Sequence, residues 1–180
     1  MGPHASRTSV TPTDDRDATA VMVALRRIVR YLRLADREAE AALGLSAAQL
    51  FVLHVLGEAP APSLVELARR TLTDPSSVST VVDRLVTRRL VRRTRAKTDA
   101  RRAELRLTAA GARVALSAPR APQVVIVAKL RAMPTARRAV LVHALDELVG
   151  LIGAAELAPR MMFEDDAGDP PPARRPRRER

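Results

Sequence analysis

The sequence contains no cysteine, and this absence removes several kinds of functional site at once. A chain without cysteine has no disulfide framework, no thiolate zinc site, no cysteine nucleophile and no thiol-based redox switch. Tryptophan is absent too, and the aromatic residues are one tyrosine and two phenylalanines. The lack of cysteine suits a reducing compartment, so we expect a cytoplasmic protein.

Glycine is also scarce, with seven in 180 residues. The sequence has no glycine-rich phosphate loop, no nucleophile elbow and no catalytic pair of carboxylates. Its three histidines, without cysteine, offer little material for a metal site. We therefore expect a protein that is not an enzyme and that uses neither a metal nor another cofactor.

Long apolar runs are missing as well. The most apolar stretch, residues 140–155, is interrupted by His143, Asp146 and Glu147, so we do not expect it to cross a membrane. Residues 1–17 are polar, contain two prolines and lack the apolar centre of a secretion signal, which predicts a flexible arm.

Positive charge is what the sequence has in excess, with a net charge of +11. Residues 84–106 hold ten basic and two acidic residues, a net +8, and residues 174–180 add +4, so the rest of the chain sums to −1. Such a confined basic stretch predicts that one part of the surface meets an anionic partner.

Helix signals cover most of the first half of the chain. Apolar residues recur at three- and four-residue spacing over residues 18–43, as on an amphipathic helix. Ser46 and Ser63 each begin a capping box, and Asp74 followed by Pro75 has the form of a helix start. These signals predict a long helix followed by three shorter ones.

The second half begins with strand signals. Residues 90–95 and 103–107 favour two strands, and the polar link 96–102 predicts a hairpin. Thr108 caps a helix that Pro119 and Pro122 should kink or interrupt, and a last helix opens at Pro134. The expected fold class is mainly α (α+β): a winged helix-turn-helix with a two-stranded wing, flanked by N- and C-terminal dimerisation helices.

We accordingly divide the chain into five parts. They are a flexible N-terminal arm (1–17), a dimerisation helix (18–45), a winged helix-turn-helix (46–108), further dimerisation helices (109–158), and a flexible acidic and then arginine-rich tail (159–180). The terminal helices carry apolar stripes that a lone winged helix cannot cover, whereas two copies of the chain bury them against each other.

The helix that begins at Pro75 carries the clearest functional signal. Its core-facing positions are Val78, Val81, Val82 and Leu85. The positions that we expect to face outward are Ser76, Ser77, Ser79, Thr80 and Arg84. Short hydroxyl side chains let a helix lie deep in a major groove, with its positive dipole end toward phosphate. A solvated polar face is the alternative interpretation.

The hairpin favours the DNA interpretation because its charges are almost all of one sign. The basic residues expected to contact DNA from this wing are Arg93, Arg95, Lys97, Arg101 and Arg102. Arginine at a wing tip can enter the narrow minor groove, where the negative potential is strongest. Asp99 could brace Arg101 by a paired hydrogen bond, or it could simply stabilise a turn. We also expect Ser63 to contact phosphate at the start of its helix.

At these residues the chain resembles the MarR-type transcriptional regulators. The matching stretches are 46–56, 64–70, 74–85 and Asp99-x-Arg101 continuing to Leu107-Thr108-Ala109-Ala110-Gly111. The resemblance covers roughly residues 20–157. It implies a homodimer that binds a palindromic operator and is released by a small, often phenolic or anionic, effector. It also implies that Ser76, Ser77, Ser79, Thr80 and Arg84 meet the major groove, and that Arg101 meets the minor groove with Asp99 beside it.

The sequence departs from that pattern at two places. Arg89 stands where the family usually has glycine after the recognition helix, and a left-handed residue there would cost a non-glycine side chain about 1 kcal/mol. Pro119 and Pro122 make the fifth helix less continuous than is usual for the family.

The resemblance places Tyr31 and His54 beside the cleft between the dimerisation and DNA-binding parts, where they could contact an effector. Plain core packing is the simpler explanation of His54 and an equally simple one for Tyr31. The expected partners are double-stranded DNA, a second copy of the chain and an unknown small-molecule effector, with no membrane. We expect a sequence-specific repressor associated with the nucleoid. The alternative is a sequence-independent architectural DNA-binding protein.

Overall fold

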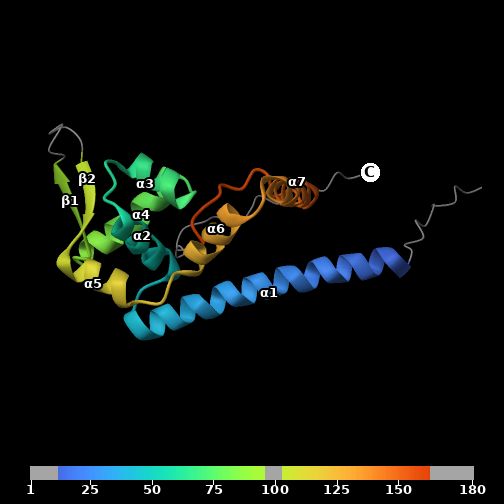
Figure 1. Ribbon diagram of the computed structural model, residues 1–180, viewed down its shortest axis with the longest axis horizontal. Coiled ribbons are helices and arrows are strands. Elements are labelled where there is room, and N and C mark those ends of the chain that lie inside the picture. The colour runs from blue at the N-terminus through green and yellow to red at the C-terminus, as the bar shows by residue number, and fades with distance from the viewer. Residues whose placement is uncertain (1–11, 96–102, 163–180) are drawn as a thin grey trace, which may run out of the picture.

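The computed structural model describes residues 12–95 and 103–162, and within these ranges the chain is mainly helical with one small antiparallel sheet (Figure 1). This architecture confirms the predicted fold class. The elements are α1 (Pro12–Leu43), α2 (Ala47–Glu58), α3 (Leu64–Thr71), α4 (Pro75–Thr87), β1 (Val91–Arg95), β2 (Ala103–Leu107), α5 (Ala109–Ser117), α6 (Pro122–Ala132) and α7 (Thr135–Leu151).

The first helix is longer than the sequence predicted. It begins at Pro12, so residues 12–17 belong to α1 and not to a flexible arm. Proline suits the first helical position because its missing N–H would have no partner there. Residues 1–11 of the predicted arm lie outside the described residues.

The predicted helix caps are present. The Ser46 hydroxyl accepts a hydrogen bond from the Gln49 amide at 3.3 Å, and the Gln49 side chain accepts one from the Ser46 amide at 3.1 Å, so the capping box of α2 is complete. The α2 helix forms the centre of the core, with Val52 and Leu53 fully buried. In α4 the Asp74 carboxylate accepts from the Ser77 amide at 2.9 Å, which fixes the first turn.

Helix α4 buries the face that the sequence predicted. Its four core positions are at most 1% exposed: Val78, Val81, Val82 and Leu85. The helix ends in a Schellman turn, in which the Leu90 amide donates to the Leu85 carbonyl and the Arg89 amide donates to the Val86 carbonyl, both at 2.9 Å. This turn requires a left-handed residue, and Arg89 has φ +57°.

The two strands form the predicted hairpin, with Val91 opposite Leu107 and Arg95 opposite Ala103. Ala61 adds a short bridge to Leu105, which attaches the wing to the chain between α2 and α3. The link 96–102 lies outside the described residues.

The Leu-Thr-x-x-Gly sequence closes the wing onto α4. The Thr108 hydroxyl accepts from the Gly111 amide at 3.0 Å and donates to the Arg89 carbonyl at 2.8 Å. A Cβ atom at Gly111 would lie 2.0 Å from the Leu90 carbonyl oxygen, so only glycine fits this close approach. The motif therefore joins the end of the recognition helix to the start of α5.

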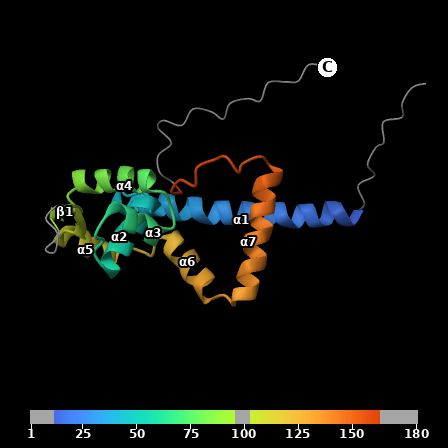
Figure 2. The ribbon, with the colours of Figure 1, turned by 90° about the horizontal axis from the view of Figure 1, so that it is seen from above.

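The prolines interrupt the helix that follows, as the sequence predicted. α5 ends at Ser117 and α6 begins at Pro122, with Ala121 buried between them. Figure 2 shows α6 and α7 leaving the winged helix, with α7 crossing over the long α1.

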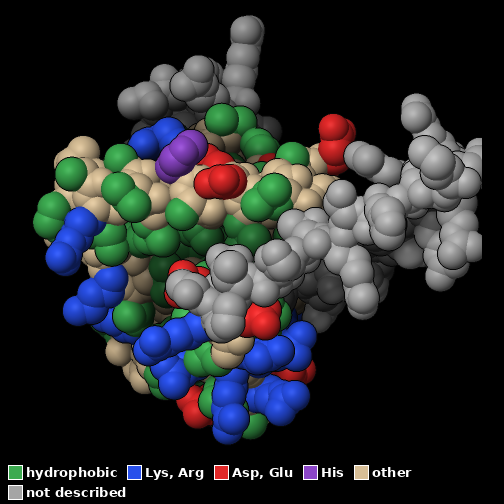
Figure 3. Space-filling view, turned by 90° about the vertical axis from the view of Figure 1, so that its right-hand side faces the viewer, with side chains coloured by type: hydrophobic (Ala, Val, Ile, Leu, Met, Phe, Trp, Pro, Cys, Tyr) green, Lys and Arg blue, Asp and Glu red, His purple; other side chains and the backbone are tan. Residues whose placement is uncertain are grey.

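Much of α1 and α7 remains open to solvent. None of the α7 residues is buried, and Leu32 and Ala39 are the buried apolar residues of α1. Figure 3, which views the molecule from the right-hand side of Figure 1, shows apolar side chains on the surface. The large apolar residues exposed on the two helices are Val21, Met22, Ile28, Val29, Tyr31, Leu34, Val140, Leu141, Val142, Leu145, Val149 and Leu151.

No single helix in the described part of the chain is long and apolar enough to cross a membrane. Residues 15–43 and 47–58 pass that test only as a pair, across a bend of 79°.

The start of the predicted flexible tail is packed against the molecule. Met161 is 5% exposed and belongs to the same buried cluster as Val78, and the Thr73 hydroxyl donates to the Pro159 carbonyl at 3.0 Å. Residues 159–162 are therefore ordered by contacts with the α3–α4 region, contrary to the sequence expectation. The remainder of the tail, 163–180, lies outside the described residues.

Candidate nucleic-acid interface

The exposed side of α4 carries short polar side chains at its start. Ser76 and Thr80 are exposed one turn apart, and the Thr80 hydroxyl donates to the Ser76 carbonyl at 3.3 Å. The Ser76 hydroxyl donates to the Asp74 carboxylate, and this bond together with the Ser77 amide lowers the pKa of Asp74. The first turn is thus held in place while its outer surface stays small enough for close approach to a flat or grooved partner.

Three of the predicted outward residues are less accessible than expected. Ser77 is 2% exposed, and its hydroxyl accepts a hydrogen bond from the Met161 amide at 2.8 Å. The outward placement of Ser77 is therefore wrong, because this position lies at the border of the core stripe and the segment 159–162 packs there. Ser79 and Arg84 are half-buried.

The wing presents arginine beside this helix. Arg92 and Arg93 are exposed in β1, and the Arg93 guanidinium forms an ion pair with Asp83 of α4 at 2.6 Å. This pair attaches the wing to the recognition helix at their shared outer surface. Among the other predicted wing residues, Arg95 ends β1, but its side chain lies outside the described atoms, as do Lys97, Asp99, Arg101 and Arg102.

Ser63 caps α3 from a separate position. Its hydroxyl oxygen accepts from the Glu66 amide at 3.1 Å, and the residue is half-buried. Its hydrogen bond satisfies the helix start, and the predicted phosphate contact stays a prediction.

The comparisons with known proteins bear on this helix and wing. Residues 43–102, which run from the end of α1 into the wing, match the family description "MarR family". The winged helix-turn-helix of this chain is therefore similar to that of the MarR family. The match covers 60 of the 180 residues, one third of the chain.

Two solved structures align over most of the chain. The transcriptional regulator BldR from Sulfolobus solfataricus is 23% identical, covering 79% of this chain and 99% of its own, with a TM-score of 0.50. A MepR-like protein solved with pseudoligands is 24% identical, covering 74% of this chain and 94% of its own, with a TM-score of 0.51. No curated protein matches the sequence. The two structures support the fold.

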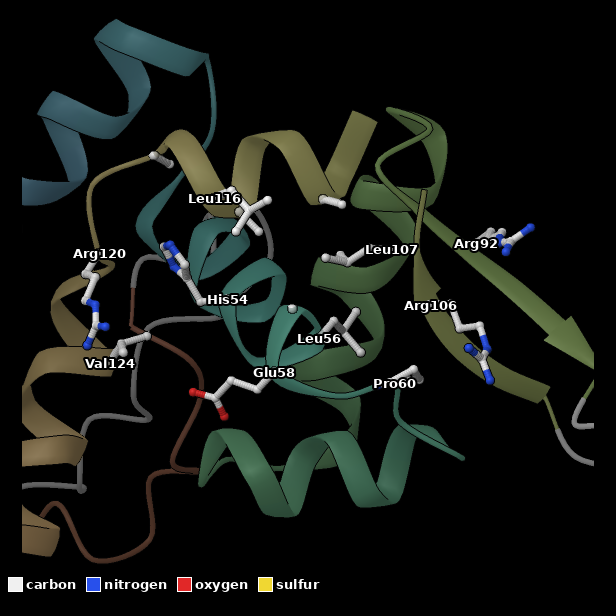
Figure 4. Close-up of a pocket in the computed structure, with 14 residues that line it drawn as sticks. His54, Leu56, Glu58, Pro60, Arg92, Arg106, Leu107, Leu116, Arg120 and Val124 are labelled. Carbon is white, nitrogen blue, oxygen red and sulfur yellow. The ribbon is translucent and has the colours of Figure 1, made fainter. Parts of the chain in front are cut away.

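A cavity of about 800 Å³ lies behind the wing. It is bounded by α2, α5, α6 and both strands, and Figure 4 shows His54, Leu116, Arg120 and Val124 toward one end and Arg92 and Arg106 toward the other. Three arginines and one carboxylate, that of Glu58, contribute the charges of its lining. The cavity therefore combines an apolar interior with an excess of positive charge.

His54 is the most unusual polar residue of the cavity. Burial is the largest influence on its ring and lowers its pKa, so that the ring is neutral at pH 7. Both ring nitrogens are buried without a hydrogen bond of ordinary geometry to any described residue. Tyr31 is 47% exposed on α1 and, among the described residues, does not belong to this lining. The structure thus separates the two candidate effector residues within one chain.

Sequence reasoning did not predict three contacts of this region. Asp83 binds Arg93, Arg120 lines the cavity from the link before α6, and Met161 packs beside the start of α4. The outward position of Asp83 follows from its spacing to Ser76 and Thr80, but its partner does not. The other two depend on how distant segments fold back, which local patterns do not report.

Proposed function

We propose that the chain is a homodimeric repressor that binds a palindromic operator in the cytoplasm through α4 and the wing, and that a small effector releases it. The carrying observation is that the hydroxyl-bearing first turns of α4 and the exposed arginines of β1 share one side of the winged helix, joined by the Arg93–Asp83 ion pair. In this arrangement α4 enters the major groove, and Ser76 and Thr80 reach base edges. The wing arginines neutralise phosphate and enter the adjacent minor groove.

The exposed apolar side chains of α1 and α7 support dimerisation. A monomeric protein rarely leaves so many large apolar groups on two neighbouring helices open to water. A twofold pair covers them and presents two recognition helices about 34 Å apart, one turn of DNA. We expect Ile28→Glu, which places a charge on the exposed α1 face, to yield monomers in sedimentation analysis. Arg26→Glu changes the charge of the same helix without removing an apolar contact and should leave the dimer intact.

The cavity beside His54 supports an effector site. Its arginines favour an anionic ligand, and because Arg92 and Arg106 belong to the wing, a ligand held there would alter how the strands sit against α2. We expect a weakly acidic aromatic compound such as salicylate, used as a probe, to lower duplex affinity in the wild type. His54→Leu should reduce that response, and an equal response in both proteins would remove His54 from the site.

Competition between two duplexes tests the proposal as a whole. The probe is the intergenic DNA upstream of the gene that encodes this chain, and the competitor is random DNA of equal length. A sequence-specific regulator releases the upstream duplex only at a large excess of competitor. Equal affinity for both duplexes would instead favour the architectural DNA-binding protein.

Two changes within the same assay separate the wing from the tail. Arg101→Ala should weaken binding strongly, because it removes the predicted minor-groove contact. Deletion of residues 174–180 should have a modest effect, since that segment offers only unspecific attraction to phosphate. The reverse ranking would place the main DNA contact in the tail.

A further inference from the structure

The segment that follows α7 returns to the recognition helix. Residues 159–162, which we call the strap, pass along the α3–α4 turn and the first turn of α4. The Pro159 carbonyl accepts from the Thr73 hydroxyl at 3.0 Å, and the Met161 amide donates to the Ser77 hydroxyl at 2.8 Å. These two hydrogen bonds flank the Asp74 cap, so the strap follows the start of the helix.

Met161 anchors the strap in the core. Its side chain is 5% exposed and belongs to the buried cluster that contains Val78 and Val81, whereas the next residue, Met162, is 44% exposed. Met161 is therefore inserted into the core and Met162 is not. Burial of one methionine side chain, added to two hydrogen bonds, is sufficient to hold a short segment in place.

The groups that the strap engages are ones that DNA binding would use. Thr73 and Ser77 flank the helix start, where hydroxyl and amide groups commonly contact the phosphate backbone. In the described structure the Thr73 hydroxyl donates its hydrogen bond to the Pro159 carbonyl, and Ser77 is buried, with 2% of its surface exposed. The four residues after Phe163 include three carboxylates, so the strap continues into sequence with the same charge sign as DNA.

We infer that the strap is an autoinhibitory element that competes with the DNA backbone for the start of the recognition helix. This inference rests on the proposed function, because it assumes that α4 binds duplex DNA. With the strap docked, the chain binds DNA weakly. When Met161 leaves the core, the Thr73 hydroxyl and the start of α4 become accessible to the DNA backbone and the affinity rises. The observed affinity is the intrinsic affinity multiplied by the fraction of molecules in which the start of α4 is uncovered. If the strap is docked in about nine of ten molecules, binding is therefore weakened roughly tenfold.

The test compares Met161→Glu with Met162→Glu in the full chain, using the upstream intergenic duplex and fluorescence anisotropy. Both variants add one negative charge at the same place in the sequence, and that charge alone disfavours DNA binding. Burying a carboxylate is costly, so Met161→Glu detaches the strap, while Met162→Glu leaves it docked. We expect Met161→Glu to bind roughly tenfold more tightly than the wild type, and Met162→Glu to bind no more tightly.

Equal binding by the two variants would overturn the inference while leaving the proposed function intact, provided that the wild type binds. Absence of duplex binding by the wild type and both variants would overturn both. Because Met161→Glu could disturb folding, the wild-type protein gives a second measurement. In methyl NMR spectra, the chemical shift of the Met161 methyl group should move toward that of an exposed methionine when the duplex is added. An unchanged chemical shift in the bound state would overturn the inference.

Discussion

The Arg93 guanidinium of β1 lies 2.6 Å from the Asp83 carboxylate of α4, which joins the wing to the recognition helix by a side-chain ion pair. Both side chains are substantially exposed, so the pair adds less than about 1 kcal/mol to stability. Under the proposed function its importance is positional, because the Asp83 carboxylate binds an arginine that would otherwise contact DNA phosphate.

We expect Asp83→Asn to release Arg93 for DNA. The variant should bind duplex DNA more tightly at low salt and steepen the decrease of log K with log salt concentration by about 0.9, the value for one additional phosphate contact. Anisotropy titrations over a range of salt concentrations measure both quantities. The double variant Asp83→Asn/Arg93→Gln lacks the freed arginine and should not show the steeper slope; a slope equal to that of Asp83→Asn would contradict the explanation.

Gly111 should be intolerant of any side chain. A Cβ there would lie 2.0 Å from the Leu90 carbonyl oxygen, so Gly111→Ala must displace α5 from the turn that ends α4. We expect a loss of about 3 kcal/mol in the free energy of unfolding, measured by chemical denaturation. Gly150→Ala is the matched control because its Cβ meets no atom within 4 Å, and alanine there should be neutral or stabilising. Similar losses in the two variants would contradict the close approach.

Arg89→Gly should stabilise the protein. Arg89 has φ +57° in the Schellman turn, a conformation that costs a residue with a Cβ about 1 kcal/mol relative to glycine. The gain should appear as a higher denaturation midpoint with an unchanged slope. Arg89→Ala removes the same charge but keeps the Cβ, so a gain equal to that of glycine would show that charge and not backbone conformation is responsible.

The stability of the wild type should depend on pH through His54. Burial lowers the pKa of this ring in the folded state below the ordinary value of 6.5, so the unfolded chain takes up the proton first as the pH falls. The contribution of the neutral His54 ring to the free energy of unfolding is therefore fully present above pH 6.5. It decreases as the pH falls from 6.5 toward the pKa of the ring in the folded state.

Denaturation of His54→Leu at pH 8.0 and 5.5 measures this contribution. The variant should lose less stability between these values than the wild type does, and it should be about 1 kcal/mol more stable at pH 8.0 because it removes buried polar atoms without partners. Parallel changes in the two proteins would assign the pH dependence to other groups.

The local features of the fold could be predicted from the sequence, whereas its long-range contacts could not. The caps at Ser46 and Asp74, the hairpin and the break between α5 and α6 each depend on residues within a few positions of one another. The Arg93–Asp83 pair joins residues ten positions apart and the Met161–Ser77 bond joins residues 84 apart, so both depend on the packed tertiary structure. The misplacement of Ser77 has the same origin, because a residue at the border of a helical stripe is buried or exposed according to what packs beside it.

The interruption between α5 and α6 has a consequence for how the two halves of a dimer are spaced. In a continuous helix, the backbone hydrogen bonds would set the angle between the DNA-binding part and the helices that we propose join the subunits. Here the helical hydrogen bonding stops at Ser117 and resumes at Pro122. Ala121 is 1% exposed and is held by packing in the core instead. In the proposed dimer, the separation of the two α4 helices is thus governed by side-chain packing around residue 121, and we expect a small change in the volume of that residue to change which half-site spacing the dimer accepts.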